Sequence, residues 1–176
     1  MKAKANRYID NGDGTTTILV YKMDGREFRF LIDTADVTAV NDRSWCINTY
    51  GYLVSGKPTV FMHRILLGLV DKEIGDHRNG DRTDNRRSNL RKTTPLGNNQ
   101  NCGMRNNSIG LKGVTLRYHR VSGITYATAM VRCPDGIRRV KQFSVQKLGL
   151  LEAVALASVA AREMREQFHG EFARHV

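Results

Sequence analysis

The first third of the chain alternates apolar and polar positions in the manner of short β-strands. Residues 15–21 (TTTILVY) and 26–33 (REFRFLID) are rich in β-branched and aromatic residues, and the turn signal Met23-Asp24-Gly25 separates them. Residues 45–48 and 50–54 predict a second hairpin. Residues 1–57 contain no recognisable catalytic constellation. They predict a β-rich N-terminal region that serves as a scaffold or docking surface.

The pattern changes at Pro58. An apolar run, PTVFMHRILLGLV, starts there and favours a short helix. The following segment, GDHRNGDRTDNRRSNLRKTTPLGNNQN, is dense in Asp, Asn, Arg and Gly. Such residues compete with regular backbone hydrogen bonding, so the segment predicts an irregular loop unless a bound metal and phosphodiester order it. Residues 58–107 therefore form a second part of the chain.

Residues 108–176 predict three strands followed by a helix. The strand-like segments are LKGVTLRYH, ITYATAMVRC and IRRVKQFSV, with turns at Ser122-Gly123 and Pro134-Asp135-Gly136. Residues 150–168 form a strong amphipathic pattern rich in Ala, Leu and Glu. This order predicts a three-stranded antiparallel sheet with one face on a helix and one face free. The expected fold class of the whole chain is α+β.

Strand alternation assigns side chains to the two faces of this sheet. On the first strand, Val114, Leu116 and Tyr118 would face the helix, while Thr115, Arg117 and His119 would face outward. On the third strand, Val140 would face the helix, so Arg139 and Lys141 would face outward. On the second strand we place Tyr126, Thr128 and Met130 inward, so that Thr125, Ala127, Ala129 and Val131 would face outward. The opposite parity of this strand stays open and would put Arg132 on the free face.

The charge of the chain points to a polyanionic partner. Lys and Arg number 28 against 17 Asp and Glu, which gives a formal net charge of +11. From Arg105 to Lys141 the chain has eight basic residues and one acid, Asp135. The excess of positive charge therefore lies largely on the predicted sheet. This favours DNA as the partner that the sheet binds, with RNA as the alternative.

Other features exclude several classes of protein. No apolar run approaches the roughly 20 residues of a membrane span, and residues 1–14 lack the apolar stretch of a secretory signal. The three cysteines, Cys46, Cys102 and Cys133, lie far apart, which argues against a disulfide scaffold and against a zinc ribbon. We expect an intracellular protein with reduced thiols and no membrane partner.

One neighbouring pair suits phosphodiester hydrolysis. This reaction needs a deprotonated water, an offset for the phosphate charge and a stabilised leaving oxygen. A neutral histidine performs the first task, and a hard cation held by oxygen ligands performs the others. Asp76 and His77 are adjacent, and a turn signal, Asn79-Gly80-Asp81, follows them. On a regular strand they point to opposite faces, so a shared site requires a turn or a twist there.

This segment resembles the HNH endonucleases, and within them the phage and intron-encoded homing endonucleases. The residues that carry the resemblance are His63-Arg64, Asp76-His77-Arg78-Asn79-Gly80-Asp81, Asp84-Asn85-Arg86-Arg87-Ser88-Asn89-Leu90-Arg91, Thr94, Asn98 and Asn101. They span roughly residues 60–107. The resemblance implies a ββα-metal fold, in which two strands and a helix clasp one divalent ion.

The same resemblance implies the role of each residue. His77 would be the general base, and Asp76 and Asn98 would be the metal ligands. Asn89 would hydrogen-bond across the loop and hold the His77 strand in place. The wider family often has His where this chain has Asn98, and an amide oxygen favours Mg²⁺, or Mn²⁺, over zinc. No small-molecule substrate is implied.

The basic residues around this motif predict phosphate contacts. Arg78, Arg86, Arg87 and Arg91 lie beside the expected cleavage site and would meet DNA phosphates. His63, next to Phe61-Met62, suits a packed structural histidine near the site. Asp84 and Asn85 fit either turn formation or phosphate contact, and both alternatives stay open. Asn101 is expected on the surface of the motif helix.

The last part of the chain resembles the ethylene-response-factor type of DNA-binding domain. Lys112-Gly113-Val114, Tyr126 and Phe143 carry the resemblance, together with the Ala-rich helix. It implies a sheet inserted into the major groove of double-stranded DNA. The residues that we assign to DNA binding here are Arg105, Lys112, Thr115, Arg117, His119, Arg139 and Lys141.

Together these features predict three parts: a scaffold at 1–57, an HNH nuclease domain at 58–107 and a DNA-binding domain at 108–176. The expected function is a homing endonuclease that cuts an extended double-stranded site, in the cytoplasm of a bacterial host if the gene belongs to a phage. A non-catalytic DNA-binding regulator and a restriction-type HNH nuclease are the alternatives. The sequence is compatible with both a monomer and a dimer.

Overall fold

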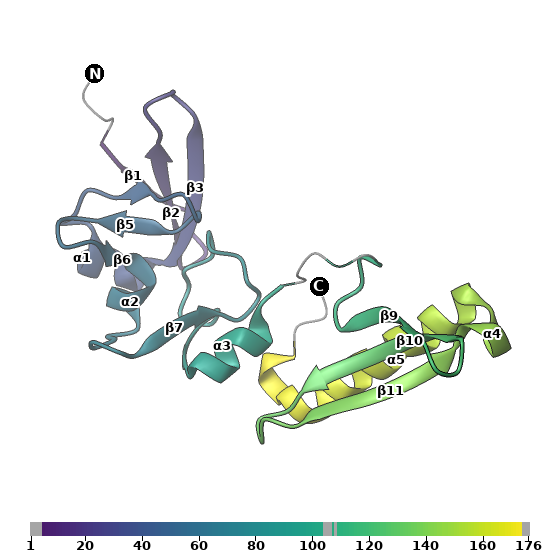
Figure 1. Ribbon diagram of the computed structural model, residues 1–176. Helices are drawn as coiled ribbons and strands as arrows, with labels where there is room; N and C mark the ends of the chain where they lie inside the picture. The colour runs from purple at the N-terminus through teal and green to yellow at the C-terminus, as the bar shows by residue number, and fades with distance from the viewer. Residues whose placement is uncertain (1–4, 104–106, 108, 174–176) are drawn as a thin grey trace. The chain divides into compact units, whose positions relative to one another are not determined.

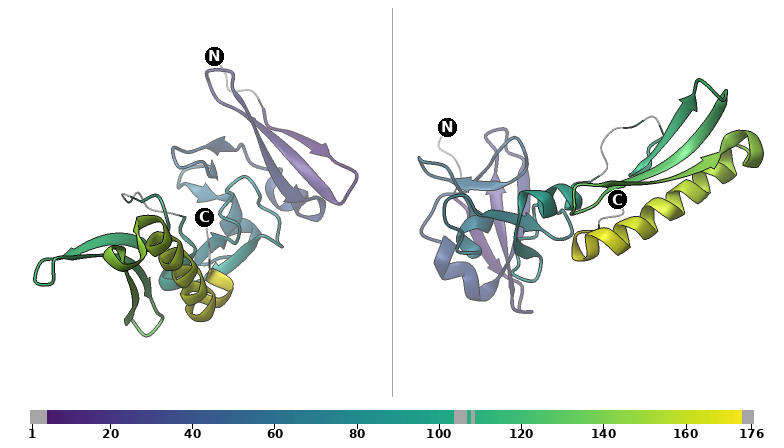
Figure 2. Two further views of the ribbon diagram at one scale, coloured as in Figure 1. Left: turned by 90° about the vertical axis from the view of Figure 1, so that its right-hand side faces the viewer. Right: turned by 60° about the horizontal axis from the view of Figure 1, so that its bottom comes forward.

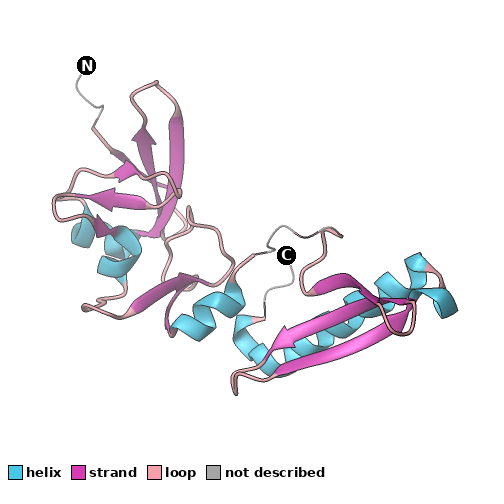
Figure 3. Ribbon diagram, in the orientation of Figure 1, coloured by secondary structure: helices cyan, strands magenta, loops and turns pink. Residues whose placement is uncertain are grey.

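The computed structural model describes residues 5–103, 107 and 109–173, and it contains helices and small antiparallel sheets (Figures 1 and 3). The expected α+β class is confirmed at this level. Contacts divide the chain into two compact units, Met1–Pro95 and Leu96–Val176. This division differs from the predicted parts 1–57, 58–107 and 108–176. The reason is that the first two predicted parts share one hydrophobic core.

The N-terminal unit begins with a three-stranded antiparallel sheet. Its strands are β1 (Arg7–Asp10), β2 (Thr15–Tyr21) and β3 (Glu27–Asp33), in the order β1-β2-β3. The predicted strands over residues 15–21 and 26–33 are therefore confirmed. A 3₁₀ turn, η1 (Thr34–Asp36), and a short helix, α1 (Val37–Val40), follow β3.

A second small sheet follows. It consists of β4 (Cys46–Ile47), β5 (Leu53–Ser55) and β6 (Val60–Phe61), and β4 pairs with β5 as the predicted second hairpin. The helix predicted from Pro58 onward is shorter than expected, since α2 spans only Met62–Leu66. Its first residues form β6 instead, because β-branched Val60 and aromatic Phe61 favour a strand when β5 offers an edge.

Both sheets and both short helices contribute to one core. Its buried members come from β2, β3, α1, the region around β4 and β5, α2 and β8, and Trp45 is among them. They are Ile18, Val20, Phe30, Ile32, Val40, Trp45, Leu53, Met62, Leu66 and Leu90. Because burial of apolar surface is the main force that stabilises a small fold, residues 1–57 and the strands after them depend on one another.

A two-stranded hairpin ends this unit. β7 (Ile74–His77) pairs antiparallel with β8 (Leu90–Thr93), which places Asp76 opposite Arg91 and His77 opposite Leu90. The connecting loop is tied to β3, where the Leu31 N–H donates to the Thr83 carbonyl (2.8 Å) and the Asn85 N–H donates to the Leu31 carbonyl (2.8 Å). Helix α3 (Pro95–Asn101) follows β8 in the chain.

The C-terminal unit has the predicted order of three strands and a helix. β9 (Val114–His119), β10 (Ile124–Arg132) and β11 (Arg138–Ser144) form an antiparallel sheet in the order β11-β10-β9. A short helix, α4 (Val145–Leu148), precedes the long helix α5 (Leu150–His169), and a 3₁₀ turn, η2 (Gly170–Phe172), follows it. Figure 2 shows α5 along one face of this sheet.

Small side chains allow α5 to pack closely on the sheet. The buried helix residues are Ala153, Ala157, Ala160, Ala161 and Met164, and they meet Val114, Ala127, Ala129 and Val131. The assignment that we favoured for the second strand, with Tyr126, Thr128 and Met130 toward the helix, is therefore wrong. Ala127, Ala129 and Val131 face the helix, and the opposite parity, with Arg132 on the free face, is the one observed.

The assignment of Arg139 and Lys141 to the free face is also wrong. Directly paired residues of an antiparallel sheet share a face, and Arg139 pairs with Val131 while Lys141 pairs with Ala129. Both lie on the helix side, where Lys141 Nζ is 3.8 Å from Glu163 Oε2 and the Arg139 guanidinium lies 5.7 Å from the Phe168 ring centroid. Because side chains alternate between the two faces of a strand, an error of one residue in the assignment places every side chain of β11 on the wrong face.

Among the described residues, no helix has the length and apolar character needed to cross a membrane.

Candidate active site and nucleic-acid interface

His77 is the last residue of β7, and its side chain is only 4% exposed. The loop after it turns back at once, since the Gly80 N–H donates to the His77 carbonyl (2.8 Å) and the Arg78 N–H donates to the Asn89 carbonyl (2.8 Å). The imidazole Nε2 lies 3.2 Å from Oδ1 of Asn85, a side chain that is 2% exposed. The ring is therefore held in one orientation by a buried amide.

The orientation of Asn85 indicates which ring nitrogen carries the proton. Asn85 Nδ2 donates to the Arg82 carbonyl (3.2 Å), so Oδ1 is the amide atom that faces His77. A carbonyl oxygen only accepts, so Nε2 of His77 is the donor and carries the hydrogen. In the neutral ring the lone pair then lies on Nδ1, which is the nitrogen able to accept a proton.

Aromatic rings pack around His77. The His63 ring centroid is 5.2 Å away and that of Tyr52 is 5.9 Å away, and Phe61 contacts His63 at 5.6 Å. Burial lowers the pKa of His77, opposed by the Asn85 hydrogen bond and then by the charge of Asp76. The imidazole is therefore kept neutral near pH 7, which is the form that a general base requires.

His63 fits the packed structural role expected from the sequence. It is 8% exposed, and burial, followed by the nearby His77, lowers its pKa to about 4. Gly75 on β7 makes room for the ring, because a Cβ there would lie 2.9 Å from His63 Cδ2 and 2.9 Å from Leu69 Cδ1. A side chain at position 75 would therefore force His63 or Leu69 to move.

Asp76 forms a buried ion pair. Arg91 Nε and Nη2 donate to Asp76 Oδ2 at 3.0 and 2.9 Å, and the side chains of Arg91 and Asp76 are 4% and 9% exposed. Arg91 is therefore not a surface cation beside the other arginines. Its predicted contact with a DNA phosphate is replaced by a structural role, in which it offsets and orients the Asp76 carboxylate across the hairpin.

Asn89 makes the hydrogen bonds across the loop that the sequence leads us to expect. Its Oδ1 accepts from the Asn79 N–H (3.0 Å), and its Nδ2 donates to the Asp84 carbonyl (2.7 Å). The side chain is 7% exposed. One buried amide thus satisfies backbone groups at two points of the loop and fixes the exit of the chain from His77.

Two arginines of the motif are engaged within the N-terminal unit. Arg86 Nε and Nη2 donate to the two carboxylate oxygens of Asp84, each at 2.8 Å. Arg87 binds Asp36 through Nε and Nη2 at 2.7–3.0 Å, while its backbone N–H donates to Asp33 (2.7 Å). Both side chains keep exposed surface, and Arg78 is exposed as well. Their contacts with DNA stay predictions.

The predicted metal ligands belong to different compact units. Asp76 lies on β7 in the N-terminal unit, and Asn98 lies half-buried on α3 in the C-terminal unit. Among the described residues no group of three or more His, Cys, Asp or Glu gathers into a metal site. A carboxylate oxygen and an amide oxygen nevertheless suit a hard cation such as Mg²⁺, so the donor chemistry fits the predicted ion.

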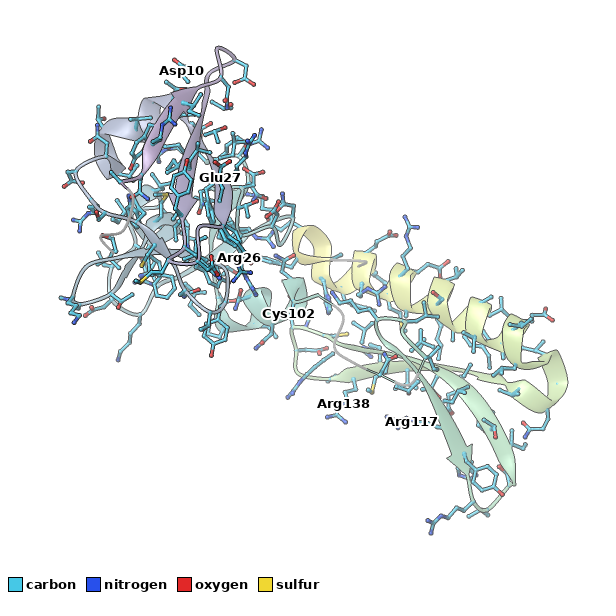
Figure 4. All side chains as sticks on the ribbon, turned by 90° about the horizontal axis from the view of Figure 1, so that it is seen from above. Asp10, Arg26, Glu27, Cys102, Arg117 and Arg138 are labelled. Carbon is cyan, nitrogen blue, oxygen red and sulfur yellow. The ribbon has the colours of Figure 1, made fainter. Side chains whose placement is uncertain are left out.

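The free face of the C-terminal sheet is basic. Arg117 and His119 of β9 share it with Arg132 and Arg138, which are directly paired across β10 and β11. Figure 4 shows the side chains of Arg117 and Arg138 on the side of the sheet away from α5. Within the described residues no acid pairs with these arginines, and like charges directly opposite one another repel. Such a surface favours an anionic partner.

The other predicted DNA contacts have mixed positions. Thr115 lies on the free face, and its buried Oγ1 has no hydrogen-bond partner among the described residues. Lys112 precedes the sheet, and its Nζ donates to the Gln100 carbonyl (3.4 Å). Arg105 lies outside the described residues.

Two residues at this site were not assigned a role by the sequence analysis. Asn85 was open between turn and phosphate contact, and the structure makes it the partner of His77. Tyr52, from the loop between β4 and β5, contacts His63 and His77 and carries the Arg82 guanidinium 4.7 Å above its ring. Asn85 is part of the motif and Tyr52 is not, but no local pattern predicts the contact of either residue with His77, because folding brings these side chains together.

The buried His63 predicts a loss of stability in acid. Its pKa falls from 6.5 to about 4 on folding, so the unfolded chain takes up a proton first as the pH falls. Stability is therefore fully present above about pH 6.5 and is lost toward pH 4. Between about pH 7.5 and 5 the free energy of unfolding should fall by about 2 kcal/mol through this residue. Urea titration followed by fluorescence of Trp45, the only tryptophan, measures it.

The His63→Leu variant provides the comparison. It keeps an apolar side chain among Tyr52 and Phe61 and removes the titrating group. Its stability should fall less than that of the unaltered chain over the same pH interval. An equal fall in both proteins would mean that His63 is not buried in the neutral form.

In comparisons with known proteins, no family model, no curated protein and no solved structure matches this chain. We therefore infer its function from its own residues and their geometry.

Proposed function

We propose that this chain is a metal-dependent endonuclease of the HNH type that hydrolyses phosphodiester bonds of double-stranded DNA. The observation that carries the proposal is the neutral, buried His77, fixed by Asn85 at the end of β7, next in the chain to a carboxylate. Asn89 braces the adjoining loop. The strand–strand–helix order β7, β8, α3 is that expected of a ββα-metal core.

His77 supplies the base in this proposal. Neutral at pH 7, it accepts a proton at Nδ1 from a water that attacks phosphorus, and the Nε2–H bond to Asn85 holds the ring during the transfer. The charge of Asp76 favours the imidazolium that forms, because a nearby anion raises the pKa of the ring. The products expected of this reaction are a 5′-phosphate and a 3′-hydroxyl.

Asp76 would hold a divalent cation in this proposal, and Asn98 stays the second ligand that the resemblance to HNH endonucleases implies. When bound, Mg²⁺ or Mn²⁺ would offset the phosphate charge and stabilise the departing oxygen. Arg91 keeps the Asp76 carboxylate in one orientation through Oδ2. Ligand oxygens held in place before binding reduce the entropy cost of taking up the ion.

The free face of the C-terminal sheet is the proposed DNA surface. Its cations, Arg117, Arg132 and Arg138, face away from α5 and suit contacts with phosphates and base edges. Binding through several phosphates should weaken steeply as salt increases. An extended, specific target, as in homing endonucleases, is part of the proposal.

A second candidate is a DNA-binding protein that does not cut. The observation in its favour is the buried Asp76–Arg91 pair, because a guanidinium already neutralises the carboxylate that would bind the metal. This candidate predicts the same DNA affinity with no cleavage in Mg²⁺ or Mn²⁺.

The first test is cleavage by the full chain. Plasmid DNA incubated with Mg²⁺ should be cut and should stay intact with a chelator. His77→Gln should lower the single-turnover rate by about 10²–10⁴-fold, the usual contribution of a general base, with DNA affinity unchanged. Lys147→Gln, on an exposed residue of α4 outside the proposed catalytic and DNA-binding residues, is the control and should keep the rate. Cleavage by His77→Gln at the unaltered rate would remove His77 from the mechanism.

A second experiment asks whether His77 is the titrating base. Asn85→Asp replaces the amide 3.2 Å from Nε2 by a carboxylate of the same shape. A carboxylate stabilises the imidazolium, so the pKa of His77 should rise. Because the base is active only when neutral, the acid limb of the pH–rate profile should move to higher pH. An acid limb that stays in place would assign the titration to another group.

The DNA surface is tested by two arginines on opposite faces of one sheet. Arg117→Gln removes a cation from the free face, whereas Arg139→Gln removes one from the helix side. Only the first should weaken DNA binding, and it should reduce the salt slope by about 1. Fluorescence anisotropy over a range of salt concentrations measures both. An equal loss in the two variants would place the DNA elsewhere.

A further inference from the structure

The C-terminal unit contains a pocket of about 700 Å³ that the proposed nuclease mechanism does not use. It lies where α3, the ends of β10 and β11, and the last turns of α5 meet, entirely within residues 96–176. The polar and charged residues that line it include Gln100, Lys112, Arg132, Arg138, Arg165 and His169. No acidic residue lines the pocket in the part of the chain that the structure describes.

Arg165 is the central feature of this pocket. Its side chain lies on the buried side of α5 and is 5% exposed. Nη1 donates to the Lys112 carbonyl (2.7 Å), but the buried Nε has no hydrogen-bond partner among the residues that the structure describes. No described carboxylate lies within ion-pair distance of this guanidinium. A buried cation without an anion is costly, so the fold keeps Arg165 at a cost that a bound anion would offset.

The surrounding backbone is shaped to hold this guanidinium. Gly113 has a φ of +76°, and a Cβ at this position would lie 2.9 Å from Arg165 Nη1 and 3.3 Å from the Met130 carbonyl. Only glycine accommodates both the positive φ and the close approach. The same glycine is part of the turn that starts β9, so the strand begins beside the charged group.

Within the described part of the chain, two further buried nitrogens at the pocket have no hydrogen-bond partner. They are Gln100 Nε2, on a side chain that is 8% exposed, and His169 Nδ1. His169 Nε2 lies 3.0 Å from the Arg132 carbonyl and donates to it. The unpaired nitrogens of Gln100 and Arg165 are donors only. Burial lowers the pKa of His169, so the ring is neutral near pH 7 and its Nδ1 is an acceptor. Unpaired buried donors in a cationic pocket select a ligand rich in acceptor oxygens.

We propose that this pocket binds a phosphate group through Arg165 and Gln100, with Arg132 and Arg138 at its rim. A phosphate offers the negative charge that Arg165 lacks and enough oxygens to accept from several donors at once. The volume exceeds that of one phosphate, so it leaves room for the attached nucleoside. Asp76, His77 and Asn89 take no part, and the proposal therefore goes beyond the nuclease site.

Inorganic phosphate is the first probe, used on the full chain. At matched ionic strength it should raise the Tm of the unaltered protein more than chloride does, and isothermal titration should give a dissociation constant. Arg165→Met should weaken phosphate binding by about tenfold or more, as expected for the loss of a charge-assisted contact. Arg162→Met is the matched control, because Arg162 is exposed on the same helix and pairs with Glu166. It should bind phosphate within about twofold of the unaltered chain.

Gln100→Leu is a second variant of the pocket, which tests the proposal even if Arg165→Met does not fold. It removes an unpaired donor and no charge, and it should also weaken phosphate binding. In phosphate-free buffer Arg165→Met should be as stable as the unaltered chain, since it removes an uncompensated buried cation. Equal phosphate affinity in Arg165→Met and Arg162→Met, or a Tm that responds to phosphate no more than to chloride, would overturn the proposal.

A second arm separates the two sources of phosphate. If the ligand is the DNA backbone, Arg165→Met also lowers duplex affinity, and inorganic phosphate competes with the duplex. If the ligand is a free nucleotide, a mononucleotide binds to the unaltered chain while duplex affinity does not change in the variant. Both results support the pocket. Phosphate binding is independent of cleavage, so a failure of the His77 experiment leaves this pocket intact, and the reverse also holds.

Discussion

The loop between β7 and β8 is polar yet buried, and the N-terminal unit depends on how its polar groups are satisfied. Asp84, Asn85 and Asn89 are each less than 10% exposed. A buried polar group without a partner would cost more than an ordinary hydrogen bond contributes. Here each of them has a hydrogen-bond partner. Asn89 bonds two backbone groups, Asn85 bonds the His77 ring, and Asp84 accepts from Arg86. The backbone of the same loop joins β3.

This arrangement explains why the N-terminal sheet and the motif form one unit. Arg87 reaches Asp36, and the backbone bonds between Leu31 and residues 83 and 85 extend β3 into the loop. Leu90 then enters the core that Phe30 and Trp45 occupy. The N-terminal strands are therefore a direct support of the proposed catalytic histidine. A substitution that destabilises the core around Trp45 would therefore also disturb the position of His77.

The two compact units deal with positive charge in different ways. In the N-terminal unit, Arg86, Arg87 and Arg91 each pair with an aspartate, so they stabilise the hairpin and its loop. In the C-terminal unit, Arg117, Arg132 and Arg138 face solvent on the free face, and the buried Arg165 pairs with no acid among the described residues. In the proposed nuclease, the second unit would supply most of the electrostatic attraction for DNA, whereas the first would position His77 and Asp76.

The sequence by itself determined the strands β2 and β3, the second hairpin, the three-stranded sheet and α5, because period-two patterns, turn residues and an Ala-rich helix are local signals. It also marked His77 and Asn89 through a dense motif. Only the tertiary structure decided the face of Arg139 and Lys141, since both faces of β10 mix small and apolar residues and the choice depends on how closely the alanines of α5 approach. Likewise, the burial of Arg91 against Asp76, the contact of Asn85 with His77 and the unpaired Arg165 arise from residues brought together by folding, which no local pattern records.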